Sequence, residues 1–215
     1  MDCFISIDDV LACRPCELAF LLDSAQKADA NAWTDMLTFV SQVVRRYSIN
    51  QNCVRVAVIR YSNTADAPIR LNTYSDVNRL VQAIGQIQLL GGSTSNLNTA
   101  LDLLRTQVFQ STIVRGSAAR NAIIVTDTLQ QNNPITTAAN NAKRDGIILI
   151  GVAITRIQRV DVNYFSTIVS NRWVVQVGDY NQLSGAVNTI VTQYACPAAT
   201  PAPPVGGMYV CYCFV

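Results

Sequence analysis

The sequence contains no histidine, and this absence removes several classes of chemistry. A Ser-His-Asp triad, a Cys-His dyad, a histidine-ligated zinc site and a histidine general base all need an imidazole ring. We therefore expect a protein that is not an enzyme.

Charge and long apolar runs are also scarce. Charged residues make up 14% of the chain, the net charge is +2, and no basic cluster is larger than Arg45–Arg46. Nucleic acid is therefore not an expected partner, because phosphate binding needs a basic surface. No apolar run approaches the roughly 20 residues that span a bilayer, so membrane insertion is not expected either.

The chain does have enough apolar material for one core. It has 215 residues, of which 50% are hydrophobic, which suits a single domain with short extensions. The composition changes after Cys196, where a proline-rich stretch begins. We expect an N-terminal extension over residues 1–12, a domain over 13–196, and a proline-rich linker with a cysteine-containing tail over 197–215.

Seven cysteines indicate an oxidising compartment. Cys13 and Cys16 form a C-x-x-C motif, which is compatible with a zinc knuckle or a redox pair. A zinc site needs a second such pair, and Cys211-x-Cys213 is too tightly spaced to supply it. Structural disulfides in a secreted protein are the favoured interpretation. The stretch after Met1 does not resemble a leader peptide, so we expect the leader to precede this numbering or the sequence to be a fragment.

Short apolar runs alternate with segments of helical periodicity. The runs predict strands over residues 17–22, 53–61, 65–71, 122–126, 147–154 and 173–177. Apolar residues at i, i+3, i+4 and i+7 spacing predict helices over 33–47, 77–84, 97–108, 135–142, 160–169 and 183–194. Buried strands separated by helices need crossover connections. We therefore expect a doubly wound α/β fold with a mostly parallel sheet and helices on both faces.

Oxygen-bearing side chains follow two of the predicted strands. Asp23 and Asp127 each end a buried strand, and the Gly91–Ser95 loop lies between them in the sequence. Such positions converge at the carboxyl edge of a doubly wound sheet, where carboxylates and hydroxyls suit a hard cation such as Mg²⁺. Two alternatives stay open. The loop could hold a phosphate, although it lacks the Walker lysine, or the aspartates could merely cap the loops that follow them.

Five stretches, in order, resemble the von Willebrand factor type A domain family. The resemblance covers residues 13–196, and it is to the domains of matrix proteins such as matrilins, type VI collagen and mollusc byssal or shell matrix proteins. It implies a six-stranded sheet with one antiparallel edge strand. The stretches are Glu17-Leu-Ala-Phe-Leu-Leu-Asp-Ser24, Val54-Arg-Val-Ala-Val-Ile-Arg-Tyr-Ser62, Leu90-Gly-Gly-Ser-Thr94 with Thr99-Ala-Leu-Asp102, Ile123-Ile-Val-Thr-Asp127 and Val175-Gln-Val-Gly-Asp-Tyr180.

The family's metal-ion-dependent adhesion site takes a D-x-S-x-S loop, a threonine and a second aspartate. The matching positions here hold Asp23, Ala25 and Lys27, followed by Thr94 and Asp127. Alanine supplies no side-chain oxygen, and lysine brings a positive charge toward the cation. The resemblance therefore implies a degenerate site without a cofactor, and Mg²⁺ only if that site still binds it.

Two further hydroxyl groups lie near these positions in the sequence. Ser24 stands at a variable position of the motif, and its side chain is expected to point away from the motif residues. Ser95 is an alternative to Thr94, because the loop is one residue longer than is usual in the family. Both serines are candidate substitutes for the missing ligands.

The resemblance also suggests a disulfide between Cys13 and Cys196 that ties the two ends of the domain together. Cys16 and Cys53 each precede a strand, and these strands are parallel neighbours in the family's sheet, about 4.8 Å apart. We therefore predict Cys16–Cys53 as the second disulfide. Cys16–Cys196 stays open as a competing pair.

In function, the resemblance implies a non-enzymatic structural or interaction module of the extracellular matrix. It is expected to be secreted and to bind matrix proteins such as collagen without a metal ion. One unpaired thiol among Cys3, Cys211 and Cys213 would allow self-assembly. A metal-dependent adhesion domain with a non-standard Mg²⁺ site is the first alternative. An intracellular nucleotide-binding α/β protein is the second.

Overall fold

The central sheet of the computed structural model has six strands, and the structure describes residues 13–25, 30–129, 131–156 and 159–196. The strand order is β3-β2-β1-β4-β6-β8, with β3 antiparallel to β2 and every other pair parallel. The bounds are β1 Cys16–Asp23, β2 Val54–Tyr61, β3 Ala65–Ile69, β4 Ala119–Thr126, β6 Ile147–Ile154 and β8 Val174–Val177. This arrangement confirms the predicted doubly wound α/β fold with one antiparallel edge strand.

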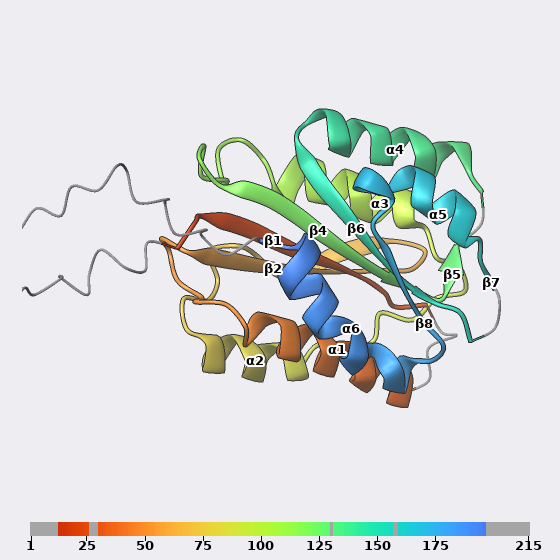
Figure 1. The fold of residues 1–215 in the computed structure, drawn as a ribbon, viewed down its shortest axis with the longest axis horizontal. Helices are drawn as coiled ribbons and strands as arrows, with labels where there is room; N and C mark the ends of the chain where they lie inside the picture. Colours follow the sequence, from red (N-terminus) through yellow and green to blue (C-terminus); the bar gives the residue numbers. More distant parts are fainter. Residues whose placement is uncertain (1–12, 26–29, 130, 157–158, 197–215) are drawn as a thin grey trace, which may run out of the picture.

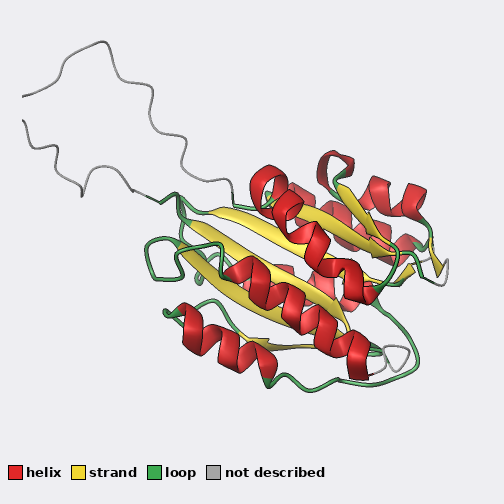
Figure 2. Cartoon of the chain, turned by 60° about the horizontal axis from the view of Figure 1, so that its bottom comes forward, coloured by secondary structure: helices red, strands yellow, loops and turns green. Residues whose placement is uncertain are grey.

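Helices cover both faces of this sheet, as Figures 1 and 2 show. Helices α1 (Ala30–Val44), α2 (Val77–Gly85) and α6 (Leu183–Thr189) pack on one face, and helices α3 (Leu97–Leu103), α4 (Asn133–Arg144) and α5 (Val162–Ile168) pack on the other. In β1, Leu18 and Phe20 join the first core, whereas Ala19 and Leu21 join the second. Because both faces of the strand are buried, its sequence is apolar without alternation.

Some helices and strands differ from the predicted ranges. The helix expected over 97–108 is α-helical to Leu103 and continues as a π-helical turn, Leu104–Val108. A second, two-stranded sheet pairs β5 (Thr128–Leu129) with β7 (Arg159–Val160) in parallel. Each of these strands has two residues, which is too short for hydrophobic periodicity to reveal.

The disulfide pairing corrects our prediction. The structure joins Cys13 to Cys53 and Cys16 to Cys196, with Cα–Cα distances of 5.3 and 5.7 Å, in place of Cys13–Cys196 and Cys16–Cys53. The reason is strand register. Cys16 lies level with Val54 rather than with Cys53, and neighbouring residues of a strand point to opposite faces. Cys16 therefore faces the core that contains Cys196. The pair Cys16–Cys196, which the sequence left open as a competing pair, is the one that forms.

Several predictions fall outside the described residues. These are the N-terminal extension, the proline-rich tail, and the cysteines Cys3, Cys211 and Cys213. The domain boundaries and the fate of the unpaired thiol therefore stay predictions. Within the ranges that the structure describes, none of the helices has both the length and the apolar character needed to cross a membrane.

Candidate functional site

The two predicted aspartates meet at the carboxyl edge of the sheet. Asp23 is the last residue of β1, and Asp127 directly follows β4, the parallel neighbour of β1. Each is only 3% exposed. Within the described part of the chain, they are not joined by a third acidic, cysteine or histidine side chain that would complete a metal-binding group.

Both carboxylate oxygens of Asp23 already accept hydrogen bonds. The Ser95 hydroxyl donates to Oδ1 at 2.9 Å, and the Thr126 hydroxyl donates to Oδ2 at 2.8 Å. The backbone N–H of Ala25 donates to Oδ1 at 3.3 Å. Thr126 is the residue before Asp127 in the fourth matched stretch of the sequence, but nothing in that motif identifies its hydroxyl as a partner of Asp23.

Burial changes the acidity of this cluster. It raises the pKa of Asp23 to about 6, and the nearby charge of Asp127 adds to the rise, whereas the hydrogen bonds to Asp23 oppose it. The pKa of the Tyr180 hydroxyl is raised by burial first and then by Asp127. The site thus holds two buried carboxyl groups near a buried phenol, and burial penalises the negative charge of Asp23 and of the phenol.

Asp127 differs from Asp23 in how its oxygens are used. Its Oδ1 accepts a hydrogen bond from the Thr128 hydroxyl at 2.9 Å. Its Oδ2 is buried and has no hydrogen-bond partner among the described residues. A buried oxygen of this kind is costly to leave unsatisfied, so Asp127 Oδ2 is the carboxylate oxygen of this cluster that is best placed to accept from a water molecule or to contact a cation.

The Gly91–Ser95 loop reaches the site through its last residue. The backbone φ angles of Gly91 and Gly92 are +74° and +107°, values that glycine adopts without strain. A Cβ atom on Gly92 would lie 2.6 Å from Asn63 Oδ1. That same amide oxygen accepts from the backbone N–H of Ser93 at 2.9 Å and from the Thr94 hydroxyl at 3.0 Å.

Asn63 therefore decides which hydroxyl faces the aspartate. Thr94 is exposed and directed to Asn63, while Ser95 is the residue that reaches Asp23. The structure thus brings together Asp23, Asp127 and the alternative Ser95, and it leaves Thr94 aside. Asn63 belongs to none of the matched stretches, since it lies one residue beyond the second of them.

Ser24 and the loop amides are engaged elsewhere. The buried Ser24 hydroxyl accepts from the backbone N–H of Leu90 at 2.6 Å, and the N–H of Gly91 donates to the Ser24 carbonyl at 3.0 Å. The N–H groups of Ser93 and Thr94 donate to Asn63. A phosphate cradle needs free backbone N–H groups, and these donors already have partners, which argues against a nucleotide-binding loop.

Ala25, which stands where the family has its first serine, has no side-chain oxygen to contribute to the site. Ala25 is buried and lies within hydrogen-bond contact of Asp23 through its backbone only. Lys27 lies outside the described residues, so the effect of its positive charge on cation binding stays a prediction.

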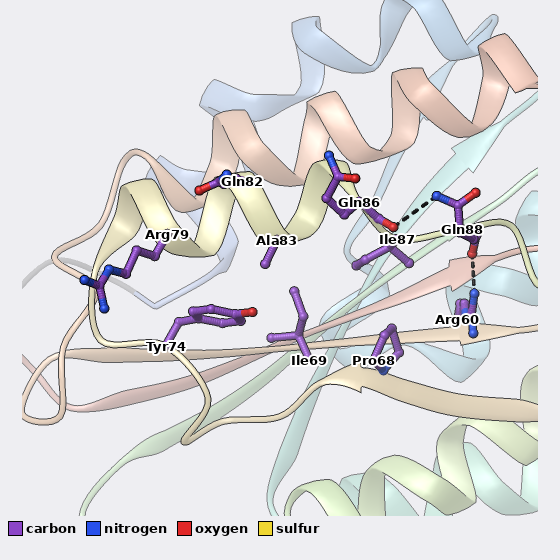
Figure 3. A pocket seen from close by; sticks show the side chains of 10 residues that line it. All are labelled: Arg60, Pro68, Ile69, Tyr74, Arg79, Gln82, Ala83, Gln86, Ile87 and Gln88. Carbon is purple, nitrogen blue, oxygen red and sulfur yellow. Dashed lines mark hydrogen bonds between the residues drawn. The ribbon is translucent and has the colours of Figure 1, made fainter.

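A second candidate site lies between the edge strand β3 and helix α2. This α2–β3 groove has a volume of about 720 Å³. Its middle is apolar, with exposed amide side chains along α2 and an arginine at each end, as Figure 3 shows. The lining residues are Arg60, Pro68, Ile69, Tyr74, Arg79, Gln82, Ala83, Gln86, Ile87 and Gln88. The sequence patterns predicted a strand over residues 65–71 but gave no sign of this groove.

The two arginines of the groove differ in whether they form an ion pair. Arg60 forms an ion pair with Asp66, with Nε and Nη2 each 2.8 Å from a carboxylate oxygen, and Nη1 donates to the Gln88 carbonyl. Arg79 is exposed, and its guanidinium forms no ion pair with a described residue. Arg79 is therefore the charge of the groove that is free to meet an acidic partner.

Comparisons with known proteins match this fold. The family model of the von Willebrand factor type A domain matches residues 17–189. Mouse Matrilin-3 is 32% identical over 146 residues, covering 66% of this chain and 30% of the relative. The human Collagen alpha-6(VI) chain is 26% identical over 187 residues, covering 84% of this chain and 8% of the relative. The chain thus spans about a third or less of the length of the curated relatives it matches.

Solved structures agree on the architecture. Proximal thread matrix protein 1 from the mussel byssus, solved with a zinc-occupied MIDAS motif, superimposes with a TM-score of 0.76 at 16% identity. The match covers 84% of this chain and 48% of that one. At this identity the likeness establishes the fold alone.

Proposed function

Because the chain belongs to the von Willebrand factor type A domain family, we propose that it is a non-enzymatic binding module of the extracellular matrix that recognises protein partners without a divalent metal. The relatives named matrilin and collagen support a matrix role. The lack of histidine is consistent with a function that needs no general base.

One observation supports the proposal that partner binding does not need a metal ion. Both oxygens of Asp23 accept hydrogen bonds from side-chain hydroxyls, and Ala25 has no oxygen to offer where the family has a serine. Mg²⁺ requires about six oxygen ligands in near-octahedral geometry. The cluster leaves one buried carboxylate oxygen, Asp127 Oδ2, without a partner. This donor set fits a resident Mg²⁺ ion poorly.

The surface that we assign to partner binding is the α2–β3 groove. The half-buried Tyr74 and the exposed Pro68 offer apolar contacts, and the exposed amides of Gln82 and Gln86 offer hydrogen bonds to a peptide backbone. Arg79 adds a charge without an ion-pair partner in the described ranges, and arginine is well suited to carboxylates. An extended or collagen-like strand that carries acidic residues fits this chemistry.

The test is binding of the full chain to immobilised triple-helical collagen, with 1 mM Mg²⁺ and with EDTA. We expect equal binding in both conditions and a loss of about tenfold in affinity for Arg79→Glu, because charge reversal at a contact arginine costs at least about 1.4 kcal/mol. Arg144→Glu, an exposed arginine of α4 on the opposite face of the sheet, is the matched control. Loss of binding in EDTA would contradict the proposal, as would failure to bind collagen at all.

A metal-dependent adhesion domain is the second candidate, and one observation favours it. Asp127 Oδ2 is buried without a partner, and a related fold binds zinc at the corresponding motif. Calorimetric titration with Mg²⁺, Mn²⁺ and Zn²⁺ separates the two candidates. Saturable binding below about 1 mM that Asp127→Asn abolishes would establish this alternative.

A further inference from the structure

The two edges of the sheet are protected to different degrees. The β3 edge contains Pro68, which has no backbone N–H, and the charged pair Arg60–Asp66. Its register with β2 is irregular between Val58 and Arg60. Proline, charge and irregular pairing are the features that keep an edge strand from pairing with another chain.

The β8 edge has none of these features. Its four residues are Val-Val-Gln-Val, without charge or proline, and they pair in regular register with β6. Val174 and Val175 are half-buried and Gln176 is exposed, so helices α5 and α6 leave this edge partly open. An uncharged, β-branched edge strand of this kind is prone to pair with another strand.

The backbone groups of β8 show which residues face outward. The carbonyl oxygen of Trp173 accepts from the backbone N–H of Gly151 in β6 at 2.8 Å. The carbonyl oxygen of Val177 accepts from the N–H of Thr155, the residue after β6, at 2.9 Å. Alternate residues of a parallel strand bond to the same neighbour, so Val174 and Gln176 direct their N–H and C=O groups away from β6. Among the described residues, the outward-facing N–H and C=O groups of Val174 and Gln176 form no backbone hydrogen bond to a loop, turn or helix.

We propose that a second copy of this chain pairs with β8 in antiparallel orientation, across a two-fold axis at Val175. In this register Val174 lies opposite Gln176 of the second copy, and the two residues exchange N–H···O bonds in both directions. The same pairing repeats on the other side of the axis, because a two-fold interface uses the same residues twice. The two sheets then form one continuous sheet.

The residues that flank β8 add no ion pair across the axis. Arg172 is exposed and precedes the strand, and Asp179 follows it. Antiparallel pairing about Val175 sets Arg172 opposite Gly178 of the second copy, and alternation directs the next residue, Asp179, to the other face of the sheet. Asp179 is paired within its own chain, where its Oδ1 lies 3.7 Å from Nε of Arg156. The stacked rings of Trp173 and Tyr194, 5.2 Å apart, extend the apolar surface beside the strand.

A four-residue edge is short, so the dimer is expected to be weak, with a dissociation constant on the order of 100 µM. The pairing uses a different surface from the α2–β3 groove, and its test does not depend on the proposed function. Because thiols could also join two chains, the test uses the full chain with Cys3, Cys211 and Cys213 replaced by serine.

Sedimentation equilibrium up to about 1 mM protein is the first measurement. We expect a monomer–dimer equilibrium that Val174→Lys/Gln176→Lys weakens by at least about tenfold, because like charges then meet across the axis. Ala65→Lys/Ala67→Lys, on the β3 edge, is the matched control and should leave the equilibrium unchanged. Circular dichroism checks that each variant is folded. A monomer at every concentration, or a dimer that only the control weakens, would overturn the proposal.

A cross-link tests the register itself. Residues at the axis form a non-hydrogen-bonded pair with Cα atoms about 4.5 Å apart, within the range of a disulfide. Val175→Cys, in the same serine background, should therefore form a covalent dimer under mild oxidation, whereas Ala67→Cys should not. Equal cross-linking of the two variants would exclude this register.

Discussion

The hydroxyl of Ser95 donates a 2.9 Å hydrogen bond to Oδ1 of Asp23, a residue 72 positions earlier in the chain. A second hydroxyl, that of Thr126, occupies the other oxygen of the same carboxylate. In this arrangement the hydroxyls stabilise the carboxyl group by themselves, as a cation would in a metal-loaded site. Among the described residues, two buried oxygens of this cluster lack a hydrogen-bond partner: Oδ2 of Asp127 and the hydroxyl of Tyr61, which lies level with Asp23 on the neighbouring strand.

Restoring the missing hydroxyls should restore metal affinity. We expect Ala25→Ser/Lys27→Ser to bind Mg²⁺ or Mn²⁺ at least about tenfold more tightly than the unchanged chain, because it adds two oxygens and removes a positive charge. Isothermal titration calorimetry measures the difference. Ser93→Ala, which changes a loop hydroxyl for which the structure shows no contact with either aspartate, is the control. Equal metal affinity of the double variant and the unchanged chain would mean that these two positions do not limit binding.

A buried ion-pair network lies at the opposite end of β1. Glu17 is fully buried and accepts from Arg55 Nε at 2.8 Å and from Arg115 Nε at 3.0 Å. Although burial raises it, the hydrogen bonds from Arg55 and Arg115 hold the pKa of Glu17 below its ordinary value. Arg115 also donates to the carbonyls of Cys16 and Cys53, so the network supports the segment that both disulfides join.

Removing the charge of Glu17 should therefore destabilise the fold strongly. We expect Glu17→Gln to lower the free energy of unfolding by about 3–5 kcal/mol, because Arg55 is left buried without its counterion. Asp66→Asn is the matched control: it removes the partner of Arg60 at the surface, where such a pair contributes about 0–1 kcal/mol. Urea denaturation at pH 7 measures both. Similar losses in the two variants would contradict the burial argument.

The disulfide pairs differ in the length of chain that they close. Cys16–Cys196 spans 180 positions and Cys13–Cys53 spans 40. On the chain-entropy model, these loops correspond to about 5 and about 4 kcal/mol of stabilisation. Peptide mapping without reduction should recover both pairs. We expect Cys16→Ser/Cys196→Ser to be less stable than Cys13→Ser/Cys53→Ser by thermal denaturation, and the reverse order would contradict the model.

The fold follows from the sequence because its physical causes are local. The run 147–154 is apolar on both faces, which places it in the middle of a sheet, and Pro68 restricts its segment to an edge. The disulfide pairing depended on a finer quantity, the register of Cys16 against Val54. One residue of register decides which face a cysteine points to, and hydrophobic patterns do not resolve it where both faces are buried.

The site was predicted in position but not in its contacts. Asp23 and Asp127 converge because parallel strands end at the same edge of the sheet. Which hydroxyl approaches Asp23 depends on the path of the Gly91–Ser95 loop, and Asn63 sets that path from about 30 positions earlier. Long-range contacts of single polar atoms leave no periodic signal in the sequence. The α2–β3 groove escaped prediction for the same reason.

The raised pKa of Asp23 predicts that the fold loses stability as the pH rises. Burial raises this pKa to about 6 in the folded state, against about 3.9 for an unfolded aspartate. The folded protein therefore binds more protons than the unfolded chain between these values, and its stability falls as the pH passes through 6. From pH 5 to pH 7 we expect a loss of about 1 kcal/mol from this group. Glu17, with its lowered pKa, acts at lower pH and with the opposite sign.

The Asp23→Asn variant isolates this effect, because an amide keeps an acceptor oxygen for Ser95 but does not titrate. Urea denaturation of both proteins at pH 5, 6 and 7 gives the free energy of unfolding at each pH. We expect the difference between pH 5 and pH 7 to shrink in the variant by about 1 kcal/mol, since the proton uptake of Asp23 is gone. If both proteins lose the same stability over this range, the Asp23 carboxyl is ionised throughout, and its two hydroxyl donors outweigh the effect of burial.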